Sequence, residues 1–151
     1  MEHPASVPSN AFVFPITVQA ADIDAQGHVS NVRVLDWMNQ AAIAHSDALG
    51  FDVPRYREIG GIFVVRRHEI DYHAPSYAEE ELRLFTWPAG KIRRSLAERR
   101  HELWRVDGTR IARGLNHWVF VDTESGRPRA MLPEVVEAFD PAQWRSEEGG
   151  A

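Results

Sequence analysis

The sequence predicts an α+β domain in which one long central helix is wrapped by an antiparallel sheet of five or six strands. Three observations lead to this fold class: apolar residues at a period of two near the start, one long stretch at helical spacing, and strand-like segments joined by short turns. The 151 residues suffice for one domain with a proper core and are too few for two. We expect a flexible leader over residues 1–10, a single domain over 11–140 and a C-terminal tail over 141–151.

The first predicted element is a strand that begins at Phe12. Phe12, Phe14, Ile16 and Val18 recur at every second position, which places them on one face of a half-buried strand. Pro15 has no backbone N–H to donate, so this strand is expected near an edge of the sheet.

The second predicted element is a helix of about five turns over residues 31–49, because apolar residues recur there at helical spacing. Gly50 stands where such a helix ends. Alanines keep several sides of the helix slim, which suits a helix enclosed by a sheet; they are Ala41, Ala42, Ala44 and Ala48.

Most of the remaining chain is strand-like. After a loop over residues 54–61, strands are expected over residues 62–73, 82–87, 93–106 and 109–122, followed by a short helix over residues 132–139. Asp107-Gly108 predicts a hairpin with a type I′ turn, because both residues accept a positive φ. An antiparallel sheet of this kind leaves open edges, so we expect pairing with a second copy, as a homodimer or homotetramer.

Composition limits the classes of function. The formal net charge of −5 argues against nucleic acid as the main partner. The absence of cysteine excludes disulfides, thiolate metal sites and a cysteine nucleophile. The first ten residues lack the basic and apolar regions of a secretory signal, and no apolar run approaches the roughly 18 residues of a membrane span. We therefore expect a cytoplasmic protein.

Residues 22–31, Asp-Ile-Asp-Ala-Gln-Gly-His-Val-Ser-Asn, are the most informative stretch of the chain. They place two carboxylates, an imidazole and an amide side chain in a glycine-bearing turn that leads into the long helix. A carboxylate there can attack an acyl carbonyl or activate water to do so, and the unpaired N–H groups of the first helical turn can hold the resulting oxyanion. The simpler reading is an ordinary turn and helix cap, but a turn requires neither His28 nor two acids one residue apart.

This stretch resembles motifs of the hotdog-fold thioesterases, in the branch that includes 4-hydroxybenzoyl-CoA thioesterase and the plant acyl-ACP thioesterases. Asp22-x-Asp24-x-x-Gly27, followed by an apolar helix with Trp37, is similar to the first group. Asp24-x-Gln26-x-His28-Val-Ser-Asn31 resembles the Asp-x-Asn-x-His-x-Asn-Asn pattern of the second, with Gln26 and Ser30 in place of asparagines. The resemblance covers about residues 12–139, including Trp118-Val-Phe-Val-Asp122 and Leu132-Pro133, and implies a hotdog fold.

The resemblance also implies roles for individual residues. Asp24 would be the catalytic carboxylate, as nucleophile or as general base on water. The backbone N–H near Asn31 would polarise the thioester carbonyl, and His28 would orient water or the acyl group. The residues expected on the substrate-binding side are Gly27, which the turn requires for its backbone, Val29 and Val34.

The chain departs from the family pattern at two helix positions. Val34 stands where an aromatic residue is usual, and Asn39 stands where many relatives carry glutamate. We therefore carry over no second carboxylate, and the shape of the acyl pocket does not follow from the motif.

Other polar and aromatic residues have simpler readings. His45 lies on the apolar stripe of the helix and is expected in the core or an interface. His68 points opposite to Glu69, Asp71 and His73 on a strand, so we expect a solvated sheet face and neither a metal nor another cofactor. One or two of the arginine pairs 66/67, 93/94 and 99/100 are expected to contact coenzyme A phosphates, whereas Trp87, Trp104 and Trp118 are expected in packing.

The function expected from the motif is hydrolysis of an acyl thioester, with acyl-CoA favoured over acyl-ACP as the substrate. A non-catalytic module that binds or senses acyl-CoA is the main alternative, because Val34 and Asn39 depart from the pattern. An acyl-thioester dehydratase or hydratase is a further alternative, which would need a second acid poised near His28.

Overall fold

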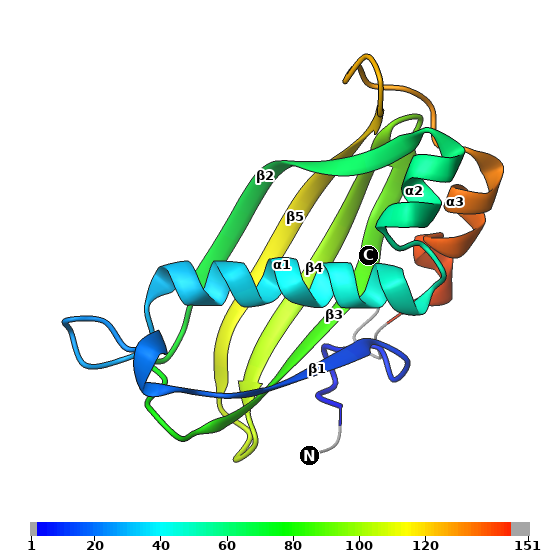
Figure 1. The fold of residues 1–151 in the computed structure, drawn as a ribbon. Helices are drawn as coiled ribbons and strands as arrows, with labels where there is room; N and C mark the ends of the chain where they lie inside the picture. Colours follow the sequence, from blue (N-terminus) through cyan, green and yellow to red (C-terminus); the bar gives the residue numbers. More distant parts are fainter. Residues whose placement is uncertain (1–2, 146–151) are drawn as a thin grey trace.

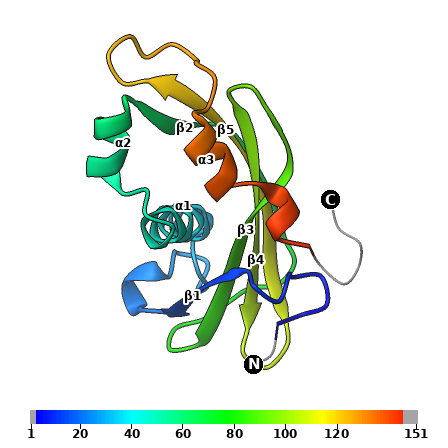
Figure 2. The same cartoon turned by 90° about the vertical axis from the view of Figure 1, so that its right-hand side faces the viewer.

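The computed structural model describes residues 3–145 and confirms the α+β fold class, with one five-stranded antiparallel sheet in the order β1-β3-β4-β5-β2. The strands are β1 (Phe12–Thr17), β2 (Gly61–Tyr72), β3 (Glu81–Arg93), β4 (Leu96–Arg105) and β5 (Arg110–Asp122). The helices are α1 (Asn31–Ala48), α2 (Val53–Ile59) and α3 (Pro133–Ala138), with single 3₁₀ turns η1 (Ala20–Asp22) and η2 (Pro141–Gln143). The sheet curls around α1, which crosses its strands (Figures 1 and 2).

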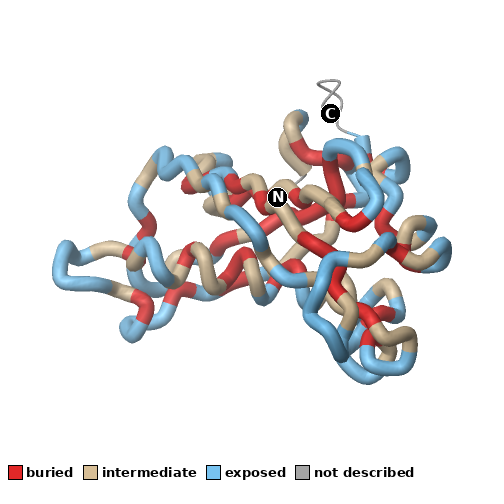
Figure 3. The backbone as a smooth tube through the Cα atoms, turned by 90° about the horizontal axis from the view of Figure 1, so that it is seen from above, coloured by how far each residue is buried: buried red, intermediate tan, exposed pale blue. Residues whose placement is uncertain are grey.

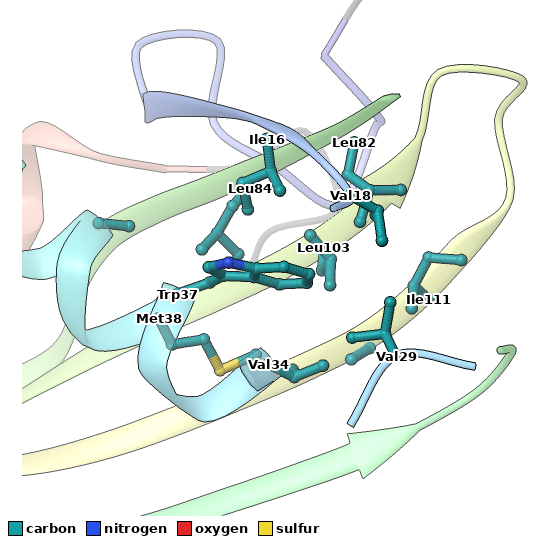
Figure 4. Packing of buried hydrophobic residues seen from close by; sticks show 12 residues of the cluster. Ile16, Val18, Val29, Val34, Trp37, Met38, Leu82, Leu84, Leu103 and Ile111 are labelled. Carbon is teal, nitrogen blue, oxygen red and sulfur yellow. The ribbon is translucent and has the colours of Figure 1, made fainter. Parts of the chain in front are cut away.

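The main core lies between α1 and the sheet. Helix α1 buries Val34, Trp37, Met38 and Ala41 against residues of β3, β4 and β5. Figure 4 shows Trp37 at the centre of this cluster, with Leu84 and Leu103 beside it. The predicted helix is therefore confirmed, and the side that carries its apolar stripe is the one that the sheet covers.

The two edges of the sheet differ. Among residues 3–145, strand β1 pairs only with β3, which confirms the expected edge position of Pro15. Strand β2 has 12 residues and pairs, in the same range, only with β5, so the described chain leaves its other edge open along its length. Helix α1 packs against β3 and β1, and the side of the molecule around β2 exposes apolar residues. These are Val32 and Ile43 of α1, Val53 of α2, and Val64 and Tyr72 of β2.

Two local predictions are wrong. The expected loop over residues 54–61 contains helix α2. Asp52 caps this helix by accepting from the Arg55 N–H (2.9 Å), and the helix ends at Gly60, which has φ +78°.

The expected hairpin between β4 and β5 is present, but its turn is not type I′. The Gly108 N–H donates to the Arg105 carbonyl (3.0 Å), and Gly108, unlike Asp107, has a positive φ (+96°), which is a type I turn closed by a left-handed glycine.

Both ends of the described chain pack on the sheet. Val7 and Trp144 join Phe85 and Trp87 of β3 in a second buried cluster. The Ser6 hydroxyl donates to Glu102 of β4 (2.8 Å). Residues expected as a leader and a tail thus contribute side chains to this cluster, while residues 146–151 of the expected tail lie outside the described part. Within residues 3–145 no helix has the length and apolar character that a bilayer crossing requires.

Candidate active site

The loop before α1 forms a small, hairpin-like projection. The Asp24 N–H donates to the His28 carbonyl (3.0 Å), and the Gly27 N–H donates to the Asp24 carbonyl (3.0 Å). Gly27 has φ +85°, a left-handed conformation that glycine adopts without a steric penalty, so the turn does require this residue. The tip of the loop is exposed and extends beyond the end of the sheet (Figures 1 and 3).

The two aspartates of the loop have different environments. Asp22 is buried, with one carboxylate oxygen accepting from Arg33 Nε (2.8 Å) and the other from the Gln19 N–H (2.8 Å). Both oxygens of Asp22 are therefore engaged, and the carboxylate holds the loop against the first turn of α1. Asp24 is exposed, and one of its oxygens accepts from the Gln26 N–H (2.8 Å). Its second oxygen has no hydrogen-bond donor within residues 3–145.

The start of α1 carries an unpaired donor. Ser30 is the N-cap, and its hydroxyl accepts from the Val32 N–H (3.2 Å), while the Arg33 N–H donates to the Ser30 carbonyl (3.0 Å). For the N–H of Asn31, the described residues supply no acceptor. The positive end of the helix dipole lies at the same place, so this amide is suited to binding an oxyanion.

The remaining predicted residues are divided between the surface and the core. His28 is half-buried, with its Nδ1 3.3 Å from the carbonyl oxygen of Val29. Val29 and Val34 belong to the core cluster and are 6% and 3% exposed (Figure 4). Their side chains pack against Trp37 and its neighbours, so the expectation that they contact the substrate finds no support in the single chain.

An apolar cavity of about 350 Å³ lies beside the C-terminal half of α1. Its walls come from α1, α2 and all strands except β1, together with Phe139 after α3. Ile43 and Val53 are exposed and mark its open side, which is the side of α1 that faces β2. The volume is at the low end of the range for small-molecule pockets.

A row of polar side chains crosses the sheet beneath α1. Arg99 of β4 pairs in register with Asn116 of β5, which pairs with His68 of β2. Both ring nitrogens of buried His101, both side-chain polar atoms of Asn116 and Nδ1 of His68 lack hydrogen-bond partners in the described part of the chain. Buried polar atoms are seldom left unpaired, so this row is a specialised part of the interior.

Arg99 connects this row of polar side chains to His45 of α1. Arg99 Nη1 donates to His45 Nδ1 (2.9 Å) and to Thr86 Oγ1 (3.1 Å). Burial, and then the nearby Arg99 charge, lowers the pKa of His45 to about 3, so the ring is neutral near neutral pH. His45 also stacks on Phe12 (ring centroids 5.0 Å apart), which confirms its expected place in the core.

A basic groove of about 790 Å³ is lined by residues of β2, the end of β3, β4 and β5, together with Arg145. Its charged residues are Arg66, Arg67, Lys91, Arg93, Arg145 and Glu98. Within the described chain, no carboxylate lies within ion-pair distance of Arg66, Lys91 or Arg93, whereas Arg67 pairs with Glu69. The groove and the apolar cavity share Ala97, Glu98 and Trp118 in their linings.

The histidine and acidic side chains at positions 68, 69, 71 and 73 do not gather on one face of the strand. Glu69, Asp71 and His73 are exposed, and His68 faces inward, as the alternation of the strand predicts. No group of three histidine or acidic side chains within residues 3–145 is arranged to hold a metal ion.

Comparison with known families and structures agrees with this architecture. The family model described as acyl-ACP thioesterase N-terminal domain matches residues 10–139. No curated protein matches. A putative oleoyl thioesterase from Lactobacillus plantarum is similar with a TM-score of 0.80 and 22% identity, over 87% of this chain and 52% of that one. This chain thus spans about half the length of that relative.

Two further solved structures are similar over nearly their whole length. A 1,4-dihydroxy-2-naphthoyl-CoA thioesterase from Synechocystis has a TM-score of 0.78 and 15% identity, over 89% of this chain and 98% of that one. The probable thioesterase YbaW from Escherichia coli has a TM-score of 0.74 and 20% identity, over 86% and 97%. These similarities confirm the hotdog fold. Because the family model covers most of the sequence, the chain belongs to the acyl-ACP thioesterase family.

The motif was visible in the sequence, but the cavity was not. Asp24, Gly27, His28 and Asn31 lie in one short loop and would be neighbours in any fold. Arg99 was only one member of an arginine pair. The strand alternation would have indicated its inward position, since Arg99 is four residues from Leu103 of the core and so shares its face.

The buried histidine leads to a prediction about acid stability. The folded protein keeps His45 neutral down to about pH 3, whereas the unfolded chain binds a proton below the ordinary pKa of 6.5. The contribution of His45 is thus present above pH 6.5 and is lost as the pH falls toward 3. Urea denaturation at about pH 7 and about pH 5 measures how much free energy of unfolding is lost on acidification. This loss should be smaller in His45→Gln than in the wild type by about 1–2 kcal/mol, because glutamine accepts the hydrogen bond without titrating. Equal losses in the two proteins would contradict this assignment.

Proposed function

We propose that this protein hydrolyses an acyl thioester, with Asp24 as the reacting carboxylate and the Asn31 N–H as the oxyanion donor. The observation that carries the proposal is that one loop of a thioesterase-family chain presents both groups unengaged. Asp24 has a free carboxylate oxygen, and the first amide of α1 has no acceptor in the described chain. Neighbouring Asp22 is excluded from this role because Arg33 and Gln19 occupy both of its oxygens.

Two routes use these groups. As general base, Asp24 takes a proton from water, the hydroxide adds to the thioester carbonyl, and the oxyanion accepts from the Asn31 N–H until the C–S bond breaks. The thiolate leaves and takes up a proton, giving a free acid and a thiol. As nucleophile, Asp24 forms an anhydride with the acyl group and expels the thiolate, and water then cleaves the anhydride. His28 is placed in the same loop to orient the water in either route.

A second copy of the chain would supply what the single chain lacks around Asp24. An exposed carboxylate works in bulk water, where charge stabilisation is weak. Val64 and Tyr72 of the open-edged strand β2 are exposed, and so is Val32 at the start of α1, where the Tyr72 hydroxyl lies 3.5 Å from the Asn31 carbonyl. An unpaired strand edge with apolar neighbours favours pairing with another strand. Antiparallel pairing of two β2 strands about a two-fold axis would cover this side and enclose the loop.

The basic groove supports coenzyme A as the carrier. Its unpaired Arg66, Lys91 and Arg93 match the phosphate groups of a nucleotide, which arginine binds through paired N–H donors. The groove also adjoins the apolar cavity through Ala97 and Trp118. A substrate with an apolar acyl group and a polyanionic carrier would use both.

The decisive variant for the reaction is Asp24→Asn. The asparagine side chain still accepts from the Gln26 N–H, so the loop is preserved while the base or nucleophile is removed. Thiol release from acyl-CoAs should fall by about 100-fold or more. Asp107→Asn is the matched control, because Asp107 accepts from the amide two residues on in an exposed turn of the same kind (2.9 Å). It should retain activity.

Two results would overturn the assignment of Asp24. Equal activity in Asp24→Asn and the wild type would remove it from the mechanism. Binding of acyl-CoA by the wild type, without any thiol release across a panel of acyl-CoAs, would instead define a non-catalytic binding module. The exposure of Asp24 outside the cavity is the observation that favours this second function.

Dimerisation through β2 is tested by Val64→Glu. A charge on the exposed face next to the open edge should prevent pairing and convert the protein to monomers in light scattering, with loss of most thioesterase activity. Val106→Glu is the control, because Val106 is a similarly exposed valine near the β4–β5 turn. An active wild-type monomer would show that the site needs no second copy.

The carrier is tested by comparing acyl-CoA with acyl-pantetheine, which lacks the nucleotide. The double variant Arg66→Ser/Arg93→Ser should raise KM for acyl-CoA by about tenfold and leave KM for acyl-pantetheine unchanged. Arg113→Ser, an exposed arginine of β5 outside the groove, should alter neither. If KM rose equally for both substrates in the double variant, the nucleotide would bind outside the basic groove.

A further inference from the structure

Arg99 is a buried positive charge without a counter-ion. Its residue is 6% exposed, and its two protein partners, His45 and Thr86, are both neutral. No carboxylate of the described chain lies within 4.0 Å of its guanidinium, which takes part in none of the ion pairs. Burial of an unpaired charge is costly, and proteins usually offset it with an acid.

The guanidinium has unused donors beside the apolar cavity. Both hydrogen bonds from Arg99 leave from Nη1, so Nε and Nη2 have no acceptor in the described residues. Arg99 lines the cavity, and so does Trp118, but the Trp118 Nε1–H is fully buried and has no partner in the described residues. The guanidinium of Arg99 is thus the group that offers unused donors to a space with mainly apolar walls.

The other charges around the cavity do not neutralise Arg99. Glu98 also lines the cavity, but its carboxylate lies near His117 (3.6 Å from Nδ1) and makes no ion pair with Arg99. Asp47 lies on an exposed turn of α1 at the open side. Burial lowers the pKa of Arg99 to about 10, and the interaction with Tyr56 opposes this shift, so Arg99 remains protonated at neutral pH.

We propose that this cavity receives the acyl group of the substrate and that Arg99 binds a carboxylate at the far end of that group. The substrate class would then be the monothioester of a dicarboxylic acid. This inference rests on the proposed thioesterase function. The apolar walls fit the methylene chain, and the carboxylate would supply the missing counter-ion and accept from Nε and Nη2 of Arg99. A plain alkyl chain would leave these donors unpaired, which disfavours it.

The position of the cavity along α1 fits this substrate. Asn39, the first helix residue in its lining, is eight residues after Asn31, or about 12 Å along a helix, and His45, which Arg99 contacts, is fourteen residues after Asn31, or about 21 Å. The proposed reacting carbonyl at the Asn31 amide and the carboxylate at Arg99 would therefore be separated by a long methylene chain.

The test compares dicarboxylic with monocarboxylic acyl-CoAs of equal chain length. In the wild type, kcat/KM for the ω-carboxyl substrate should exceed that for the plain one by about 10- to 100-fold, as expected for a hydrogen bond to a charged group. In Arg99→Met this ratio should fall to about one or reverse. Arg100→Met, one residue along β4 and on the opposite face, is the matched control and should keep the wild-type ratio.

The outcomes separate this inference from the proposed function. Hydrolysis of plain acyl-CoAs with equal or better efficiency would overturn the inference and leave the thioesterase intact, whereas no thiol release from any substrate would overturn both. A merely structural Arg99 would lower activity on both substrates equally in Arg99→Met and leave the ratio unchanged, which would also overturn the inference. If Arg99→Met does not fold, Arg99→Lys and the wild-type substrate comparison still decide, because the wild-type ratio requires no variant.

Discussion

The packing of α1 against the sheet is the constraint on which the rest of the structure depends. The apolar stripe that includes Val34, Trp37 and Met38 lies on β3 and its neighbours, and this fixes both the direction and the rotation of the helix. Its N-terminal amides are thereby held at one end of the sheet, beside the loop that carries Asp24. The apolar cavity lies between the C-terminal half of α1 and residues of α2, β2 and the neighbouring strands.

The ion pair between Asp22 and Arg33 holds the loop before α1, although the motif alone would suggest a catalytic role for Asp22. Asp22 and Asp24 are one residue apart, but only Asp22 is buried, where Arg33 neutralises it. This division separates a carboxylate that holds the loop from one that remains free to react.

The interior of this hotdog domain is unusually polar beneath the helix. Arg99, Asn116 and His68 occupy successive strands, and His101 lies next to them with both ring nitrogens unpaired in the described chain. Apolar residues in these positions would make a more stable core at lower cost. Retaining polar groups there agrees with the proposed binding function of the cavity beside them, which Arg99 lines.

The sequence by itself determined the elements with strong periodicity: the edge strand with Pro15, the long helix from Asn31, and the hairpin around Gly108. It also determined that Asp24, Gly27, His28 and Asn31 are neighbours, because a short loop keeps them together in any fold. The tertiary structure alone decided which aspartate is free, because the burial of Asp22 depends on Arg33 from the helix. It alone placed Val29 and Val34 in the core and Arg99 beside a cavity, because strands and a helix distant in sequence enclose that space, and local periodicity carries no information about what lies opposite a residue.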